Sequence, residues 1–416
     1  MLSGRTLIGS SFVLINIIAC FIMIQTGELI GDVKGVFIND YGVLGISAIL
    51  VCISYVVVLF FLFNYLVRIK FPKVKFKYEH LAQKRIGILF FVLQILFVFF
   101  NLFNGVNIAG SGNSSTSSIF SIFWVFFPVD LFLVIYYAFF RRSGLFKVNI
   151  SVAIFSSIVR GRADIFVLIL FFEICRKIRD KSLSIKKLAF LSLAILCFYP
   201  AITALKFAFR LYLGDGGEGQ SLDFIFFELI NRNQGDGYLY ILYSGFEHIV
   251  GRLQTVSLVS EIARFSNELL EVYSQGGFYP FWLEGLHGII IDQVLGNPRN
   301  VPLGTAFTSV GDFNWEFDVG DWNTNPGLVG WIVLNPLWTG SYVIYILLLC
   351  FLSVFFSKLI GESDMRNDMI WYSWAFYLMP AWIGIFVLFI YTLFLFFMIK
   401  SFFSYLPPIK ILGRTI

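Results

Sequence analysis

The sequence is poor in charge. Charged residues make up 14% of its 416 residues, whereas hydrophobic residues make up 58% and phenylalanine alone occurs 51 times. A soluble domain carries about 25% charged residues, so this composition excludes an ordinary soluble enzyme, and its apolar excess also excludes a disordered chain. Apolar runs of about twenty residues recur from end to end, without the alternation of a membrane barrel. We therefore expect an all-α polytopic membrane protein.

Cysteine and histidine are scarce as well, with five and three residues. All five cysteines lie inside apolar runs and none is spaced as a pair, so neither a disulfide framework nor a metal site is expected. The chain also lacks the H-E-x-x-H, P-loop and G-x-S-x-G patterns of zinc hydrolases, nucleotide-dependent enzymes and serine hydrolases. We expect no cofactor, no metal and no nucleic-acid partner.

The apolar runs and the charges between them predict a topology. Connection 68–85 holds seven basic residues against one Glu, and connection 176–187 holds six against one Asp. Short basic loops stay in the cytoplasm, so loops 27–40 and 105–118, which alternate with them, are predicted on the outer face. The amino terminus is then cytoplasmic. The predicted apolar runs are 7–26, 41–67, 86–104, 119–140, 188–205, 340–358 and 370–399.

Residues 148–175 break this pattern, because Arg160, Arg162 and Asp164 interrupt an otherwise apolar run. A single crossing would put its two basic flanks on opposite sides of the membrane. We therefore predict a hairpin of two short helices, about 12 and 11 residues, each reaching ~18 Å into a hydrocarbon core of ~30 Å. The turn would lie in protein or in a cavity open to the outer face, which makes it a candidate site. The alternative is a tilted hairpin whose arginines merely reach the interface.

The end of the chain predicts a second hairpin, because Pro380 interrupts the long run 370–399 and basic residues follow it. The total is about ten transmembrane spans, including the two short-helix hairpins, with both termini in the cytoplasm. The chain then divides into a transmembrane bundle 1–205, a large outer segment 206–339 and C-terminal spans 340–416.

The large outer segment differs in charge from the remainder. It holds six basic and fifteen acidic residues, a net charge of −9, whereas the rest of the chain carries +14. Aromatic-rich pieces at 237–248 and 276–288 are predicted to lie at the membrane interface. Other apolar residues recur at helical spacing, with Glu261 and further charges on other faces. They predict an amphipathic helix that lies on the membrane or caps the bundle: Leu253, Val256, Val259, Ile262, Phe265 and Leu269.

Six arginines are predicted on the outer side. They are Arg160, Arg162, Arg210, Arg232, Arg252 and Arg299. The arginine fork stays charged and donates two hydrogen bonds, which suits a lipid diphosphate at the membrane surface. The alternative is that each arginine pairs with a nearby carboxylate. His248 or the neighbouring Glu247 is the candidate general base, with Glu284 as a further choice.

Four stretches carry a resemblance to a known family: VRGRAD (159–164), KFAFRLYLG (206–214), ELINRNQGDG (228–237) and NTNPGLVGWIVLNPLWTG (323–340). Together with the Phe-rich bundle and one large outer segment, they make the whole chain resemble the Wzy-type O-antigen polymerases, which join oligosaccharide repeat units. The last stretch is similar to the Asn/Pro-Gly-Leu-x-Gly stretch before a late span of many such polymerases.

The resemblance implies glycosyl transfer at the periplasmic face of the bacterial inner membrane. The growing glycan would leave its undecaprenyl diphosphate for the sugar of a new lipid-linked repeat unit, while arginines neutralise the leaving diphosphate. The implied partners are undecaprenyl-diphosphate-linked glycans and the lipid bilayer, and a chain-length regulator is left open. Polymerases often have an acidic residue after Gly-Leu-x-Gly, where this chain has Trp331.

Three other functions stay open at this point. A polysaccharide flippase or other transporter would also have charges inside the membrane. Another lipid-dependent membrane glycosyltransferase would act through a metal held by Asp32 or Asp40 in the first outer loop. An O-antigen ligase is disfavoured, because ligases usually carry a His-Asn pair where this chain has Trp322-Asn323.

Overall fold

The computed structural model describes most of the chain, and nearly all the secondary-structure elements of this part are helices. Within it, the only strands are β1 (Lys410–Ile411) and β2 (Arg414–Thr415), which pair antiparallel near the C-terminus. The described residues are 3–72, 74–108, 119–162, 164–183, 186–187, 250–295, 300–310 and 324–408, with the backbone of the two strands.

The chain forms two compact units, each assembled from segments distant in sequence. Unit 1 comprises Met1–Phe71, Phe246–Phe355 and Ile370–Tyr391, and unit 2 comprises Pro72–Gly245, Phe356–Met369 and Thr392–Ile416. The division predicted from charge, 1–205, 206–339 and 340–416, describes which side of a membrane each segment lies on. The two units describe packing and do not test it, so that division stays a prediction.

Among the described residues, six helical segments are long and apolar enough to cross a membrane, which gives the chain the architecture of a multi-pass membrane protein. They match six of the seven predicted apolar runs, and the seventh, 188–205, lies outside the described residues. The predicted total of about ten spans is not confirmed. The six segments are Gly4–Thr26, Tyr41–Arg68, Glu79–Asn104, Phe120–Phe140, Pro336–Ile360 and Ile383–Tyr405.

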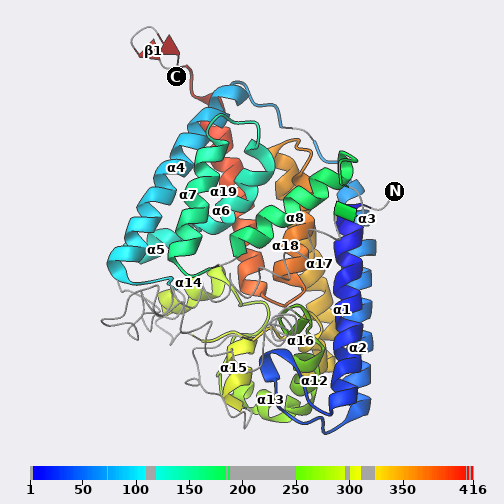
Figure 1. Ribbon diagram of the computed structural model, residues 1–416. Coiled ribbons are helices and arrows are strands. Elements are labelled where there is room, and N and C mark those ends of the chain that lie inside the picture. Colours follow the sequence, from blue (N-terminus) through cyan, green and yellow to red (C-terminus); the bar gives the residue numbers. More distant parts are fainter. Residues whose placement is uncertain are drawn as a thin grey trace, which may run out of the picture. The chain divides into compact units, whose positions relative to one another are not determined.

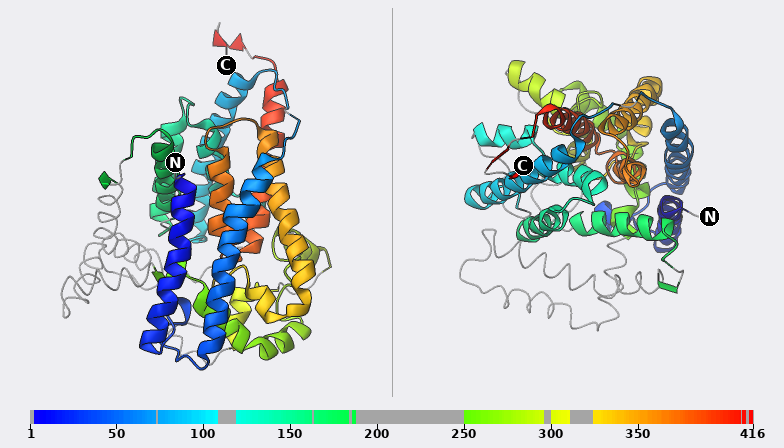
Figure 2. Two further views of the ribbon diagram at one scale, coloured as in Figure 1. Left: turned by 90° about the vertical axis from the view of Figure 1, so that its right-hand side faces the viewer. Right: turned by 90° about the horizontal axis from the view of Figure 1, so that it is seen from above.

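In unit 1, helices α1 (Gly4–Thr26) and α2 (Tyr41–Tyr55) lie side by side (Figures 1 and 2). The Asp40 carboxylate begins α2 by accepting hydrogen bonds from Gly42 N–H (2.7 Å) and Val43 N–H (3.1 Å). The same run continues through a π-helical stretch, η2 (Val56–Leu62), into α3 (Phe63–Arg68). Loop 27–40 between α1 and α2 contains a short 3₁₀ turn, η1 (Gly31–Val33).

The predicted amphipathic helix consists of two helices in the structure, α12 (Val256–Arg264) and α13 (Ser266–Ser274), which break at Phe265. Helix α12 packs against α2 and against α16 (Gly330–Leu334), and its residues 256–262 are buried on every face. The prediction that Glu261 lies on a polar face is therefore wrong. The carboxylate is 3% exposed and pairs with Arg264 at 3.1 Å, which permits its burial.

Three further short helices and most of one long helix also belong to unit 1. In the aromatic piece 276–288, Phe278, Tyr279 and Phe281 are buried within the protein and Trp282 is 44% exposed, while its position at a membrane interface stays a prediction. Pro336 opens a 3₁₀ turn, because proline fits the first position of a helix. The elements are α14 (Leu286–Leu295), α15 (Leu303–Val310), η5 (Pro336–Trp338) and α17 (Thr339–Ile360), the last of which continues into unit 2.

In unit 2, α4 (Glu79–Asn104), α6 (Val129–Phe140) and α7 (Phe146–Val159) pack together (Figure 1). The buried side-chain amide of Asn149 joins them. Asn149 donates to the Gly87 carbonyl (3.1 Å) and to the Tyr136 hydroxyl (3.0 Å), and its Oδ1 accepts from Gln94 (2.9 Å). Hydrogen bonds from side-chain amides join helices in this way where the surrounding lipid and apolar side chains offer no other hydrogen-bond partner.

The predicted hairpin is present as two short helices, α7 with 14 residues and α8 (Asp164–Arg179) with 16. The chain leaves α7 at Arg160 and turns at Gly161, whose φ of 65° suits glycine. A single helix through this region is thereby excluded. Before the hairpin, Phe127 and Pro128 separate α5 (Ile119–Phe126) from α6, because proline cannot donate a backbone hydrogen bond.

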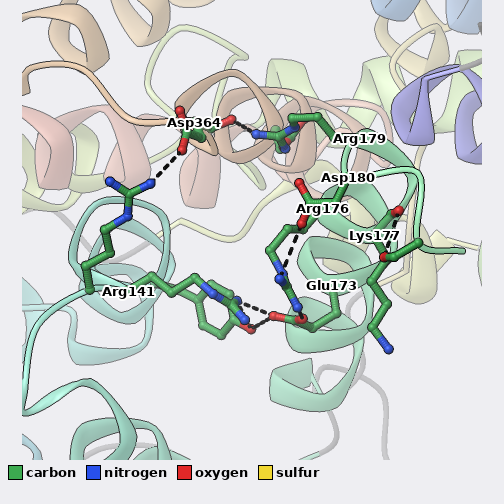
Figure 3. A network of polar contacts seen from close by, with 11 residues as sticks. Arg141, Glu173, Arg176, Lys177, Arg179, Asp180 and Asp364 are labelled. Carbon is green, nitrogen blue, oxygen red and sulfur yellow. Dashed lines mark hydrogen bonds and ion pairs between the residues drawn. The ribbon is translucent and has the colours of Figure 1, made fainter.

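The basic flanks of the hairpin meet at one end of unit 2. Figure 3 shows Glu173 of α8 between Arg141, which follows α6, and Arg176 of α8, whose Nη2 lies 2.8 Å from Glu173 Oε2. Arg179 pairs with Asp368 and donates to the Asp364 carbonyl in the same network. Connections 141–147 and 176–187 therefore begin at the same end of unit 2, as the hairpin prediction requires.

The interruption predicted at Pro380 is also present, but the two arms differ. Helix α18 (Arg366–Ser373) continues into the π-helical η6 (Trp374–Leu378), and the chain turns at Ala381 with φ of 62°. Helix α19 (Ile383–Tyr405) has 23 residues and is long enough to cross a membrane alone. The prediction of two short arms is therefore wrong for the second arm.

Candidate functional site

The turn between α7 and α8 brings two of the predicted arginines onto one carboxylate. Asp130 lies at the start of α6 and forms a bidentate ion pair with Arg160. Nη2 donates to Oδ1 at 2.6 Å and Nη1 donates to Oδ2 at 2.9 Å. Arg162 donates to the same Oδ2 at 2.7 Å. Two guanidinium groups are thus held side by side, and we call Asp130, Arg160, Arg162 and Asp164 the hairpin cluster.

The two arginines of the hairpin cluster differ in solvent exposure. Arg160 is 3% exposed, donates through Nε to the Ser156 carbonyl (3.2 Å) and lies 5.0 Å above the Phe97 ring. Arg162 is 37% exposed, and its second contact is to Asp164 Oδ2 at 2.5 Å, on a carboxylate that is 47% exposed. The cluster therefore has one buried, fixed arginine, Arg160, and one, Arg162, that reaches the protein surface together with Asp164.

Arg252 lies in unit 1 and has its own carboxylate. Its Nη1 is 3.1 Å from Oδ1 of Asp32, which is 8% exposed and also accepts the backbone N–H of Asn325. Burial raises the pKa of Asp32, while Arg252 and the Asn325 N–H oppose that shift. The contact joins the predicted outer loop 27–40 to the large segment, so both lie at the same end of unit 1.

The stretch NTNPGLVG near the last part of the large segment has a packing role where it is described. Gly327, with φ of 69°, donates to the Pro380 carbonyl (3.2 Å), and Leu328 N–H donates to the Met379 carbonyl (2.8 Å). A Cβ on Gly327 would come within 3.0 Å of Val259 on α12. Glycine is needed here for both the left-handed backbone and the close approach. Trp331, which follows, is completely buried.

Glu284, the further choice for a base, is enclosed in unit 1. It is 4% exposed, and Oε1 accepts the N–H of Leu303 at 3.2 Å. Burial raises the pKa of Glu284 to about 8, although the Leu303 N–H lowers it slightly. A carboxyl that is 4% exposed and holds its proton near neutral pH bears on the stability of unit 1, and its role as a base stays a prediction.

The remaining predicted site residues lie outside the described residues: Arg210, Arg232, Arg299, Glu247 and His248. Sequence reasoning missed Asp130, the residue around which the hairpin cluster forms. Its signal was available, because an acidic residue inside an apolar run marks a buried partner or a functional site. Of the candidate metal ligands, Asp32 pairs with Arg252 and Asp40 caps α2.

Comparison with known proteins adds no relative: no family model, no curated protein and no solved structure matches the chain.

Proposed function

We propose that this chain is a membrane glycosyltransferase that polymerises undecaprenyl-diphosphate-linked oligosaccharide repeat units into O-antigen or a similar surface polysaccharide. The reaction would take place at the outer face of the bacterial inner membrane. The observation that carries the proposal is the pair of guanidinium groups that Asp130 holds side by side in a multi-pass membrane architecture. The resemblance of VRGRAD and NTNPGLVG to repeat-unit polymerases adds support from the sequence.

The chemistry of the transfer assigns different tasks to the two arginines. The bond between the anomeric carbon and the diphosphate oxygen breaks, and its electron pair leaves with the diphosphate. Arg162 exchanges Asp164 for a phosphate oxygen and stabilises the charge that develops there. Arg160 keeps its fork on Asp130 and so holds Arg162 in place. The acceptor hydroxyl forms the new glycosidic bond and gives its proton to a base, for which His248 and Glu247 remain the predictions.

The proposal is tested in cells that lack the gene. Loss of a polymerase leaves single repeat units on the cell surface, loss of a ligase leaves polymer on the lipid carrier, and loss of a flippase leaves neither. Surface glycan resolved by length distinguishes these outcomes. Single repeat units support the proposal, and either of the other two patterns refutes it.

A conservative variant then tests the arginine role. Arg162→Lys keeps the charge but loses the fork, so it is expected to lower polymerisation at least about tenfold. Arg142→Lys is the matched control, because Arg142 is 93% exposed and Asp364 is its only ion-pair partner among the described residues. Normal chain length with Arg162→Lys, at normal protein level, would remove Arg162 from the mechanism.

A further inference from the structure

Two buried N–H donors beside the hairpin cluster have no acceptor among the residues that the structure describes. They are Nδ2 of Asn101 on α4 and Nε1 of Trp124 on α5. Asn101 is completely buried, and its Oδ1 already accepts from Asn107 at 2.8 Å, which leaves the amino group as the unsatisfied end. Buried donors without partners are rare and need a physical reason, such as a bound ligand or water.

Phe97 of α4 connects these donors to the arginines. Its ring lies 5.0 Å from the ring of Trp124 and 5.0 Å from the guanidinium carbon of Arg160. Asn101 follows Phe97 by one helical turn on the same face of α4. Trp124 and Arg160 therefore both contact Phe97 within unit 2, and Asn101 lies one turn further along the same face of α4.

Asn101 Nδ2, Trp124 Nε1 and the two arginine forks are all donors, so a partner common to these four groups must accept hydrogen bonds. The oxygens of a phosphate or diphosphate offer acceptors only, and they pair well with arginine forks. The position agrees with a lipid headgroup, because α4 ends at Asn104 and α5 begins at Ile119. Both ends border loop 105–118, which the charge pattern predicts on the outer face. A sugar hydroxyl fits less well, since it must also donate.

We infer that Asn101 and Trp124 complete an anion site with Arg160 and Arg162, and that its ligand is the diphosphate headgroup of an isoprenoid lipid carrier. The choice of that carrier rests on the proposed function, whereas the anion site rests on the donors alone. When the headgroup binds, Asp164 releases Arg162, and the Asn101 and Trp124 donors gain the acceptors that they lack. The two arginines and two aspartates of the hairpin cluster sum to no net charge. The N–H groups of Asn101 and Trp124 add donors without adding acceptors, and so favour an anion.

The experiment measures binding to the full-length protein in lipid nanodiscs, with farnesyl diphosphate as the probe. Farnesol and inorganic diphosphate serve as comparisons, because they separate the lipid tail from the anion. Farnesyl diphosphate is expected to bind, inorganic diphosphate to compete with it, and farnesol to bind far more weakly. Competition by inorganic diphosphate as strong as by the lipid form would assign the site to free phosphate and overturn the lipid-headgroup assignment.

Two variants test the donors themselves. Trp124→Phe keeps the aromatic packing and removes the N–H, and Asn101→Leu keeps the size and removes the amide. Each is expected to weaken binding of farnesyl diphosphate about tenfold, the loss of one hydrogen bond to a charged acceptor. The control is Trp382→Phe, whose indole N–H is likewise buried without a partner but belongs to unit 1.

The outcomes separate this inference from the proposed function. Wild-type affinity in a folded Trp124→Phe protein overturns the role of that donor even if Asn101→Leu fails to fold. Equal weakening by Trp382→Phe also overturns the inference, because the effect would then be general. Specific binding that needs Asn101 and Trp124, in a protein that forms no polymer from repeat units, keeps the anion site and refutes the polymerase.

Discussion

Replacing Glu284 by glutamine is expected to stabilise the protein in alkaline solution. Glu284 is 4% exposed, and its one hydrogen bond in the described structure comes from Leu303 N–H at 3.2 Å. Burial raises its pKa from 4.5 to about 8, so the folded state favours the protonated acid. Glutamine has nearly the same shape, remains uncharged at every pH and can still accept the Leu303 N–H.

The magnitude follows from the difference between the two pKa values. Below about pH 4.5 the acid is protonated in both states, and ionisation costs the folded protein nothing. As the pH rises from 4.5 to about 8, the unfolded chain ionises and the folded one does not. Each pH unit lowers the free energy of unfolding by ~1.4 kcal/mol, so wild type loses up to ~5 kcal/mol over this window. Above about pH 8 the carboxyl is ionised in both states, so this group lowers the free energy of unfolding no further.

The assay is the unfolding temperature in detergent, measured from about pH 5 to about pH 9. Wild type should lose stability over this range more steeply than Glu284→Gln, and the difference should level off above about pH 8. The matched control is Glu271→Gln, since Glu271 is exposed at the end of α13. If Glu284→Gln and wild type lose stability in parallel, the buried carboxyl is not the cause and the reasoning fails.

Two further predictions concern packing and topology. Gly327→Ala should lower the free energy of unfolding by ~2 kcal/mol or more, because φ is 69° and the new Cβ would lie 3.0 Å from Val259. Gly340→Ala, whose Cβ meets nothing within 4 Å, should have no such cost in the same thermal assay, and equal effects would contradict the packing role. Ser274→Cys should react with an impermeant thiol reagent in intact spheroplasts, whereas Ser182→Cys in the predicted cytoplasmic connection should react only after lysis. Protection of Ser274→Cys would reverse the predicted orientation.

The spans and the first hairpin could be predicted because length and charge decide them locally. An apolar run of sufficient length must be helical in a membrane, since each backbone donor needs a partner within the segment. The hairpin followed from two basic flanks that had to lie on one side, and the structure brings Arg141 and Arg176 to the same Glu173. Neither inference required knowledge of distant contacts.

The contacts of the candidate site could not be predicted in the same way. Asp130 stands alone in its apolar run, and the arginines that hold it come from a later helix and its turn. Asp32 likewise pairs with Arg252 from the large segment, although the sequence suggested a metal role for it. Glu261 has a local partner, Arg264, three residues on in α12, but helical spacing does not reveal that α2 and α16 pack over this helix and bury the carboxylate. Tertiary packing decides the partners of Asp130 and Asp32 and the burial of Glu261, and the local pattern reveals none of these.

The proposed activity is measured most directly with the purified protein in proteoliposomes that contain undecaprenyl-diphosphate-linked repeat units. We expect undecaprenyl diphosphate to be released as each glycosidic bond forms, and Arg162→Lys to slow both its release and bond formation at least about tenfold while Arg142→Lys does not. Failure to form polymer from the host's own repeat units, or an unchanged rate with Arg162→Lys, would contradict it.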